Sequence, residues 1–600
     1  MAGTWNTFNA PSGVKADTML LLTDGTVLVH DANRPSLSNT YGGKNWYRLT
    51  PDSHGDYRNG TWSGALAMNG QRKYFASGVL ADGRVFVVGG EYSDVNGDTD
   101  TSTDNDGRGE ILDPVTGTWS AMNKPSPAFD FVKGDVVSIV LGDGRVLFGA
   151  VASGATGQRN AIWDPVTDTW VEAGTRFGTV ANTKKGNSNE ESWCLLPNGN
   201  VLTVQIAGTT ATQNAEMYVP ANDEWVTAGL TASTLPVGTI GTTTLNEIGG
   251  ALTLLNGKAF FVGGSGHTGI YTSGATTTAK GSWVAGADLP ADASNVNAPA
   301  GLQTSLDGSV VMLPNGHLLI TSGPVDPGGQ FFSGPVTICD VDENGANLTT
   351  QSNQPTAAPG HTWQCCFLLL PSGHVLMTGE QNTINEYQPD AAELTPKNSS
   401  RPVLTTAPNA LIAGHSYQIA GKQLNGLTHA NGYGDDRQNA TNYPLLRLTN
   451  ASGDVRYLRT HSFSTMAIAT ENAIVTAVVD VPSNLPPGTW SLEVVANAIA
   501  STPLTVGVGT RDCFLVMDRS TAGQGEVQAL IALNGAPAVI DPAIFLVVEG
   551  FTPNELGLTM ANLASPPIVP LFLPPLTGLH VVQRGAVLPE DPSQIGRAHV

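Results

Sequence analysis

The feature that most constrains this chain is a hairpin unit that occurs seven times between residues 18 and 379. In each copy an apolar segment leads into a turn such as Asp-Gly or Asn-Gly, and a second apolar segment follows. These dipeptides favour the positive φ of a type I′ turn, so each copy predicts an antiparallel hairpin with a two-residue turn. The turn glycines, which lie 55 to 61 residues apart, are Gly25, Gly83, Gly144, Gly199, Gly257, Gly316 and Gly373.

A tryptophan in a recurring tripeptide follows five of the hairpins, namely Trp62, Trp119, Trp170, Trp225 and Trp283. A fixed aromatic residue at this phase is typical of a propeller blade, where it packs one four-stranded sheet on the next. A β-solenoid would have much shorter repeats. The seventh copy lacks such a tryptophan, but Trp5 lies in the same tripeptide before the first hairpin. We therefore expect the N-terminal strand to complete the seventh blade and close the ring.

The hairpin repeat predicts a seven-bladed propeller for residues 1–398, and the repeat is absent from the residues that follow. Residues 399–508 alternate in polarity with turn signals about every ten residues, which favours an immunoglobulin-like sandwich. Residues 511–594 suggest a small α+β region of unknown function, in which GEVQALIALN (525–534) is predicted to be a helix. Residues 595–600, IGRAHV, resemble a translated sequencing adapter, so we expect the C-terminal region to be incomplete. Apart from that helix, the predicted fold class is all-β.

Composition excludes some classes of function. Only 13% of the 600 residues are charged, against about 25% in an average globular protein, and 69 Gly and 38 Pro favour turn-rich β structure. The net charge of −22 would repel a phosphate backbone, so we expect no nucleic-acid partner. No apolar run reaches 18 residues, so no membrane span is expected, and the start does not resemble a classical signal peptide. Low lysine and high Asn, Thr and Gly contents nevertheless favour an extracellular protein.

The repeat phrasing DGRVFVVGG (82–90) and DPVTGTW (113–119), followed by a sandwich, resembles the galactose oxidase and glyoxal oxidase superfamily. The resemblance covers residues 1–508. It implies a kelch-type propeller followed by an early-set sandwich. It also implies a copper ion on the propeller axis, bound by two Tyr and two His, with one Tyr joined to a Cys and one His supplied by the sandwich.

Carried over to this chain, the copper site is incomplete. The cross-linked tyrosine matches Tyr74, and the sandwich histidine matches His461 in RTHSFSTM. The cysteine position holds Ala16, and the Tyr-His pair expected at the start of the seventh inner strand reads Trp363-Gln364. Trp offers no ligand atom and Gln is a poor copper ligand, so we expect neither copper nor radical oxidation. The family's stacking aromatic position reads Tyr92.

The repeat also predicts which residues surround the axis, because the residue eight positions before each turn Asp, Asn or Ser occupies the same place in every blade. Three of these seven residues are carboxylates, which repel one another unless something compensates their charge. In blade order, the residues are Ala16, Tyr74, Asp135, Glu190, Ile248, Asp307 and Gln364.

Three interpretations of this ring stay open. The basic residues Lys73, Arg72 and His461 could compensate the carboxylates within the protein. A hard divalent cation such as Ca²⁺ could do so instead. A polyhydroxylated ligand such as a carbohydrate would donate its hydroxyls to the carboxylates while its apolar faces lie on aromatic rings. The residues predicted for that ligand site are Tyr74, Tyr92, Asp135, Glu190, Asp307, Trp363, Gln364 and His461.

An acidic segment directly after the second hairpin, residues 91–110, is a separate candidate for Ca²⁺. Asp94, Asn96, Asp98 and Asp100 would supply oxygen ligands, although the segment lacks the Gly and Glu that an EF-hand requires. The function predicted from the sequence is ligand binding at the axial face rather than catalysis. A copper-dependent oxidase with a rearranged site and a structural or adhesive scaffold are the alternatives.

Overall fold

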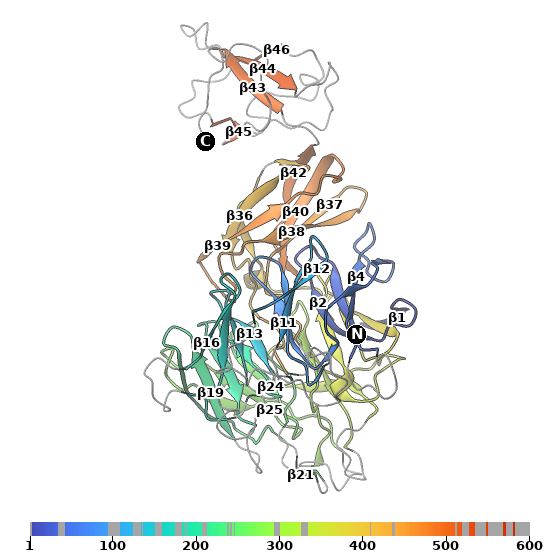
Figure 1. Cartoon of the computed structure of the whole chain (residues 1–600), viewed down its shortest axis with the longest axis vertical. Helices are drawn as coiled ribbons and strands as arrows, with labels where there is room; N and C mark the ends of the chain where they lie inside the picture. The colour runs from blue at the N-terminus through green and yellow to red at the C-terminus, as the bar shows by residue number, and fades with distance from the viewer. Residues whose placement is uncertain are drawn as a thin grey trace.

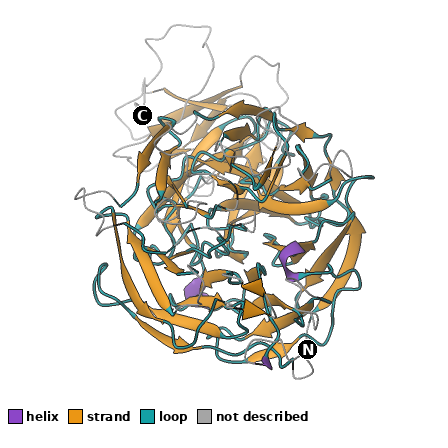
Figure 2. Cartoon of the chain, turned by 60° about the horizontal axis from the view of Figure 1, so that its bottom comes forward, coloured by secondary structure: helices purple, strands orange, loops and turns teal. Residues whose placement is uncertain are grey.

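The computed structural model is a seven-bladed β-propeller followed by further β structure (Figure 1). Each blade is built on four antiparallel strands, which in blades one to six follow in sequence order from the inside outwards; in blade one the short strand β6 (Leu66–Ala67) also pairs with β4. In Figure 2 the blades surround a centre that loops cross. The structure describes residues 3–33, 42–93, 108–123, 134, 136–149, 159–174, 183–186, 188, 190–206, 213–236, 239–240, 243–244, 247–292, 301–325, 334–408, 410–434, 438–509, 513–518, 527–533, 548–549, 568–571 and 580–581.

The strands of the blades follow in chain order. Blades one to three consist of β2 (Ala16–Leu21), β3 (Val27–Asp31), β4 (Asn45–Thr50) and β5 (Thr61–Trp62); β8 (Ala76–Val79), β9 (Val85–Val88), β11 (Gly109–Asp113) and β12 (Thr118–Ala121); and β13 (Ser138–Val140), β14 (Val146–Phe148), β15 (Ala161–Asp164) and β16 (Thr169–Glu172). Blades four to six consist of β17 (Cys194–Leu195), β18 (Val201–Val204), β19 (Asn214–Val219) and β20 (Glu224–Leu230); β23 (Ala251–Thr253), β24 (Ala259–Val262), β25 (Thr268–Thr272) and β26 (Ser282–Ala285); and β27 (Val310–Met312), β28 (Leu318–Ser322), β29 (Thr337–Val341) and β30 (Leu348–Thr350).

The seventh blade closes the ring with the N-terminal strand, as expected. It consists of β31 (Cys366–Leu369), β32 (Val375–Thr378), β33 (Thr383–Gln388) and, as its outermost strand, β1 (Thr4–Asn9). β1 pairs with β33 over six residues, and the rings of Trp5 and Tyr387 lie 5.1 Å apart. Chain segments almost 400 residues apart in sequence therefore share one sheet, which removes an open sheet edge.

The hairpin turns correct the turn type predicted from the sequence. Leu22 donates its N–H to Thr26 O at 2.8 Å and Gly25 donates to Leu22 O at 3.0 Å, so the loop has three residues instead of two. Only the glycine has positive φ, 76° at Gly25 and up to 97° in the other copies. The Asp24 side chain accepts the N–H of Thr26 at 3.0 Å, which holds the right-handed part of the turn. This is a type I turn followed by a left-handed glycine, the geometry of three-residue hairpins.

Packing between blades uses the repeated tryptophans, as the sequence predicts. The inner strands are buried along their whole length, whereas outer strands such as β12 and β26 are largely exposed. Trp119, Trp170 and Trp283 each donate the indole N–H to a carbonyl of the preceding blade, at 3.0 to 3.3 Å. Each of these tryptophans therefore joins its blade to the preceding blade through a hydrogen bond as well as through apolar contact.

A nine-stranded sheet follows the propeller. Its strands are β34 (Val403–Thr406), β35 (Ala410–Ile412), β36 (Ser416–Lys422), β37 (Leu445–Asn450), β38 (Val455–His461), β39 (Ile474–Asp480), β40 (Gly488–Ala496), β41 (Ile499–Ala500) and β42 (Leu504–Gly509). It lies against the hairpin-turn end of the propeller, where Thr460 and Phe463 donate backbone N–H groups to Thr23 O and Ala81 O. The immunoglobulin-like assignment of this unit stays a prediction.

The C-terminal region corrects the predicted helix. The described segments there are β43 (Cys513–Asp518), β44 (Val527–Leu533), β45 (Val548–Glu549), β46 (Ile568–Leu571) and β47 (His580–Val581). β44 lies within the predicted helix, but it pairs with β43 on one side and β46 on the other. Pairing on both edges overrides the helix preference of its Ala and Leu residues. Among the described residues, no helix is long and apolar enough to cross a membrane.

A loop from the nine-stranded sheet fills the propeller axis. This axial loop, residues 423–444 between β36 and β37, hydrogen-bonds to five of the seven blades in its described part. A segment that contacts the inner strands of five blades lies inside the ring. Its partners are Leu21, Ser77, Trp193, Ala251 and Val310, which contact Tyr443, Gln438, Gly432, Asn431 and Asn439 respectively.

Candidate functional site

The ring of residues predicted from the repeat has a common backbone feature. Tyr74, Glu190 and Asp307 have φ values of 55°, 51° and 50°, a left-handed conformation that is uncommon for residues other than glycine. Three blades therefore turn the chain in the same way just before the inner strand. Such strained positions often occur at functional sites because the surrounding structure must hold them in place. Asp135 lies outside the described residues, as do Asp94, Asn96, Asp98 and Asp100.

The seventh position differs from the expectation. Trp363 and Gln364 do not open the inner strand, because they belong to a 3-10 helix, η5 (Thr362–Gln364), that precedes β31. The Gln364 side-chain carbonyl accepts the backbone N–H groups of Gly360 and His361, both at 3.1 Å. Gln364 is therefore a helix-capping residue, and η5 presents Trp363 in place of a strand residue.

Three half-buried aromatic residues form the centre of the candidate site. The Tyr74 ring lies 5.8 Å from the Tyr92 ring and 6.2 Å from the Trp363 ring, both nearly edge to face. The imidazole of His361 stacks on Trp363 at 6.1 Å with an interplanar angle of 10°. Two short strands of blade two position Tyr74 and Tyr92. β7 (Arg72–Lys73) pairs with β10 (Tyr92–Ser93) and places Tyr92 opposite Lys73, the residue before Tyr74.

A buried ion pair lies beneath these rings. The Lys73 ammonium is 4.7 Å from the centre of the Tyr74 ring and 5.4 Å from that of Trp363. Lys73 is fully buried, and its Nζ forms an ion pair with Glu380, whose side chain is 15% exposed. The negative faces of aromatic rings attract a cation, so Lys73 helps to hold Tyr74 and Trp363 in these positions. Glu380 neutralises its charge, which a buried ammonium requires.

The structure shows a partner for one of the acidic ring residues that the sequence did not indicate. Asp307 is 1% exposed and accepts a hydrogen bond from the hydroxyl of Tyr433 in the axial loop. Glu190 is half-buried beside Glu191. The basic residues considered for the ring have other carboxylate partners, since Lys73 pairs with Glu380 and Arg72 with Glu110.

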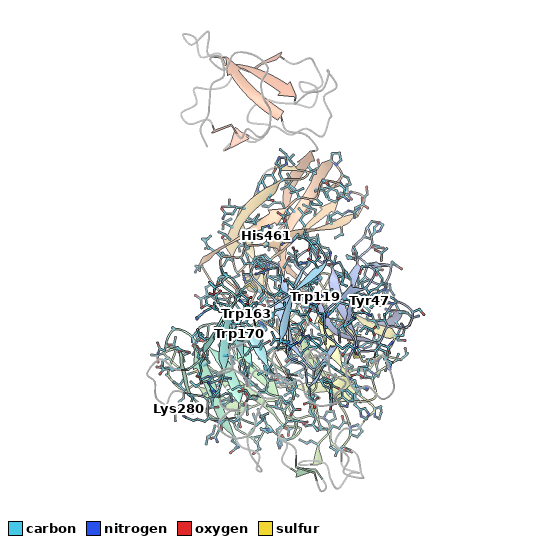
Figure 3. All side chains as sticks on the ribbon, in the orientation of Figure 1. Tyr47, Trp119, Trp163, Trp170, Lys280 and His461 are labelled. Carbon is cyan, nitrogen blue, oxygen red and sulfur yellow. The ribbon has the colours of Figure 1, made fainter. Side chains whose placement is uncertain are left out.

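His461 lies at the other end of the propeller from Tyr74. Phe463, two residues further on, contacts Ala81 at the far end of β8, whereas Tyr74 directly precedes that strand. His461 Nε2 is 3.2 Å from Asp480 Oδ1 and its Nδ1 is 2.9 Å from Ser462 Oγ. In Figure 3 His461 lies among the strands of the nine-stranded sheet, beyond the blades that carry Trp119 and Trp170. The structure therefore does not bring His461 to the aromatic cluster.

The residues around Tyr74 do not fit the copper ion that the family resemblance implies. A metal bound at the Tyr74 oxygen would share its surroundings with the buried Lys73 ammonium, and the two positive charges would repel each other. The second tyrosine position holds Trp363, whose ring carries no ligand atom. In the described part of the chain, no three His, Cys, Asp or Glu side chains converge on a point that could hold a metal.

Two buried carboxylates that the sequence reasoning missed anchor the loops before the inner strands. Glu110 accepts the N–H of Asn69 at 2.8 Å and pairs with Arg72 at 3.1 Å, beside Tyr74. Glu216 accepts the N–H of Lys185 at 2.7 Å in the same way. In the sheet, each glutamate is paired with the residue four positions after the turn glycine of its blade. Their equivalent positions in the repeat could therefore have identified them from the sequence.

The second of these anchors is a buried charge cluster in blade four. The Lys184 ammonium lies 2.8 Å from Glu191 and 3.3 Å from Glu216, and all three side chains are buried. Burial raises the pKa of Glu191 to about 7, although the ion pair with Lys184 opposes that shift. The cluster fixes the segment that leads into Glu190 and β17.

Comparison with known proteins gives no family for this chain. No family model matches it, and no curated protein matches it in sequence. Two structures of the extracellular domain of BT4673 from B. thetaiotaomicron are similar at TM-scores of 0.37 and 0.38 with 10% and 11% identity, covering 85% and 89% of this chain and 60% and 65% of theirs. The WD40 β-propeller domain of Doa1 is similar at a TM-score of 0.35 with 12% identity, covering 65% of this chain and 98% of that domain. The chain thus spans less than two thirds of the BT4673 domain.

Proposed function

We propose that this chain is a kelch-type propeller protein, galactose-oxidase-like in build, that binds a polyhydroxylated ligand on the axial face around Tyr74. The observation that carries the proposal is the cluster of three half-buried rings, Tyr74, Tyr92 and Trp363, held over the buried Lys73 ammonium. The C–H face of a sugar ring packs on such aromatic surfaces, because they combine apolar area with polar edges.

Carboxylates belong to the same predicted axial face as the rings. Glu380, whose side chain is 15% exposed, is paired with Lys73 beneath the rings, and Glu190 is a half-buried carboxylate at the equivalent position of blade four. Carboxylates with several lone pairs suit a ligand with many O–H donors. A carbohydrate is therefore the ligand class that this combination favours. Binding, rather than oxidation, is favoured because the Lys73 ammonium, 4.7 Å from the centre of the Tyr74 ring, would repel a metal ion bound at the Tyr74 oxygen.

An array of neutral oligosaccharides probed with the full chain tests this function. Trp363→Ala and Tyr92→Ala each remove one ring of the cluster, and we expect both to abolish the signal seen with the wild type. Tyr47→Ala is the matched control, because Tyr47 is a half-buried aromatic residue on β4 of blade one, outside the cluster. An unchanged array profile in both cluster variants would overturn the proposal.

A further inference from the structure

A serine, a histidine and a carboxylate meet on the nine-stranded sheet, at the end of β38. His461, the last residue of that strand, has its Nδ1 2.9 Å from Ser462 Oγ and its Nε2 3.2 Å from Asp480 Oδ1. The pairing of β38 with β39 places Asp480 opposite Arg459, and therefore diagonally across from His461 on the same face of the sheet. Ser462 is exposed, and the side chains of His461 and Asp480 are 22% and 36% exposed. A molecule from solvent can therefore reach all three groups.

The carboxylate of this cluster is held in place and kept ionised. Ser416, directly opposite on β36, donates to Asp480 Oδ1 at 2.6 Å, and Arg459 donates to Oδ2 at 2.8 Å. Burial raises the pKa of Asp480, but hydrogen bonds from Ser416, His461 and Arg459 outweigh that effect and lower the pKa below its ordinary value. Asp480 is therefore a fixed negative charge at neutral pH.

That negative charge determines which nitrogen of His461 carries the proton. An ionised carboxylate only accepts hydrogen bonds, so Nε2 donates to Asp480 and Nδ1 keeps its lone pair. The Ser462 hydroxyl therefore donates its hydrogen to Nδ1. The result is the order of groups in a Ser-His-Asp triad, in which a base accepts the hydroxyl proton and a carboxylate holds that base in the correct tautomer.

A contact between a neighbouring serine and histidine is not sufficient for such a site. Ser53 Oγ lies 3.2 Å from His54 Nδ1 in an exposed turn after β4. The nearby carboxylate, Asp52, accepts the backbone N–H of His54 at 2.8 Å rather than a ring N–H. The feature that distinguishes Ser462 from Ser53 is thus the carboxylate on the far side of the imidazole.

The backbone at Ser462 supports a reactive role. Its φ of 54° lies in the left-handed region, which is uncommon for serine and is maintained only where the surroundings hold it. Phe463 provides that restraint, because it is 7% exposed and donates its N–H to Ala81 O of blade two at 3.0 Å. The N–H of Ser462 donates to none of the described residues, so it is free to donate to an oxygen that becomes negative during attack on a carbonyl.

We propose that Ser462, His461 and Asp480 form a nucleophilic site that hydrolyses short-chain carboxylic esters. Ser462 Oγ forms a bond to the carbonyl carbon while its proton passes to His461 Nδ1. The bond from that carbon to the alcohol oxygen then breaks, and His461 returns the proton to the departing alcohol. Water removes the acyl group from Ser462 by the same two steps, so one ester and one water give one acid and one alcohol.

The surroundings of Ser462 favour a small substrate. Its exposed neighbours on this face, Ser464 and Ser416, are polar and short, so a long apolar acyl chain would gain little by binding there. The site belongs to the nine-stranded sheet, at the other end of the propeller from Tyr74. It is therefore independent of the proposed carbohydrate site, and either proposal can fail without the other.

Hydrolysis of 4-nitrophenyl acetate by the full chain tests the proposal. Ser462→Ala and Asp480→Asn should each lower the initial rate on the order of hundredfold, because the first lacks the nucleophile and the second no longer holds the base in its tautomer. Ser53→Ala is the matched control and should keep the wild-type rate. The melting temperature of each variant, measured alongside, shows that the chain is folded.

Covalent labelling supplies a second readout that general surface hydrolysis would not give. Diisopropyl fluorophosphate transfers its phosphoryl group to an activated serine with loss of fluoride. Mass spectrometry of the digested protein should find the label on the peptide that contains Ser462 in the wild type and in Ser53→Ala, and on no peptide of Ser462→Ala.

Three results would refute the proposal. One is equal initial rates for the wild type and Ser462→Ala, which would assign the hydrolysis to other groups. Another is a wild-type chain that neither hydrolyses the ester faster than buffer nor takes up the label. The third is a rate that falls in Ser462→Ala but not in Asp480→Asn, which would show that the carboxylate has no part in the reaction.

Discussion

Tyr433, on the axial loop, donates its hydroxyl hydrogen to Asp307, a carboxylate of blade six. Asp307 has a φ of 50° and is 1% exposed, so it is both strained and removed from water. The bond joins the nine-stranded sheet to the propeller at the axis, beside the ring of residues that the repeat identified. The axial loop is therefore part of the propeller's structure rather than a connection between two independent units.

The first prediction concerns this bond. Tyr433→Phe should lower the free energy of unfolding by about 1–3 kcal/mol, because it leaves a buried carboxylate oxygen without that donor. Urea unfolding at neutral pH measures the change. Tyr47→Phe is the control for losing a tyrosine hydroxyl elsewhere, and it should change the stability by less than about 0.5 kcal/mol. Equal unfolding midpoints for the two variants would contradict the account.

A second prediction concerns acid stability. His429 of the axial loop is 4% exposed, and burial lowers its pKa to about 4. Below about pH 6.5 the unfolded chain binds a proton at this residue, whereas the folded chain stays neutral until about pH 4. The folded state should therefore lose up to about 3 kcal/mol between these pH values through this residue alone.

Denaturant midpoints measured from pH 7 to pH 4.5 test this. The wild type should lose more stability over the range than His429→Gln, which cannot titrate there. A His415→Gln variant is the control, since His415 is a histidine of the nine-stranded sheet region that is not buried in the axis. Parallel pH profiles for the wild type and His429→Gln would contradict the buried position of His429.

A third prediction concerns water at the axis. A cavity of about 10 Å³ lies between the inner strands and the axial loop, and Ser138, His429 and Asn442 line it. Ser138 Oγ, His429 Nδ1 and Asn442 Oδ1 are buried and lack partners. This is about the space and the number of polar partners that one buried water requires. A crystal structure at better than about 2 Å resolution should show electron density for one ordered water there. A cavity without such density would contradict the prediction.

A fourth prediction concerns ring closure. Deletion of residues 1–10 removes β1, its six residue pairs with β33 and the contact between Trp5 and Tyr387, so the melting temperature should fall by several degrees. Deletion of residues 595–600 is the control and should leave the melting temperature unchanged. Equal melting of the two truncated chains would show that β1 contributes nothing to closure.

The repeat made the propeller predictable from sequence because each blade carries the same turn, the same apolar strands and, in most copies, the same tryptophan. It also placed Tyr74, Glu190 and Asp307 at equivalent positions, which their shared left-handed backbone supports. The predicted turn type was wrong because Asp-Gly and Asn-Gly occur both in two-residue and in three-residue hairpin loops. Only the backbone hydrogen bonds of residues such as Leu22 distinguish the two loops.

Features set by contacts between distant segments could not be predicted from local patterns. The axial loop is irregular in sequence, so nothing in residues 423–444 indicates that it fills the ring. The strand β44 depends on neighbours at both edges, which a helix-favouring composition does not reveal. The pairing of Lys73 with Glu380 joins blades two and seven, and it is this pair that completes the aromatic site.

The most direct test of the account is a calorimetric titration of the full chain with an oligosaccharide that the array identifies. The account predicts binding to the wild type and to Tyr47→Ala with the same affinity. It predicts at least about tenfold weaker binding to Trp363→Ala, since stacking on an aromatic ring supplies about 1.4 kcal/mol or more. Equal affinities for the wild type and Trp363→Ala would contradict the claim that the aromatic cluster is the binding site.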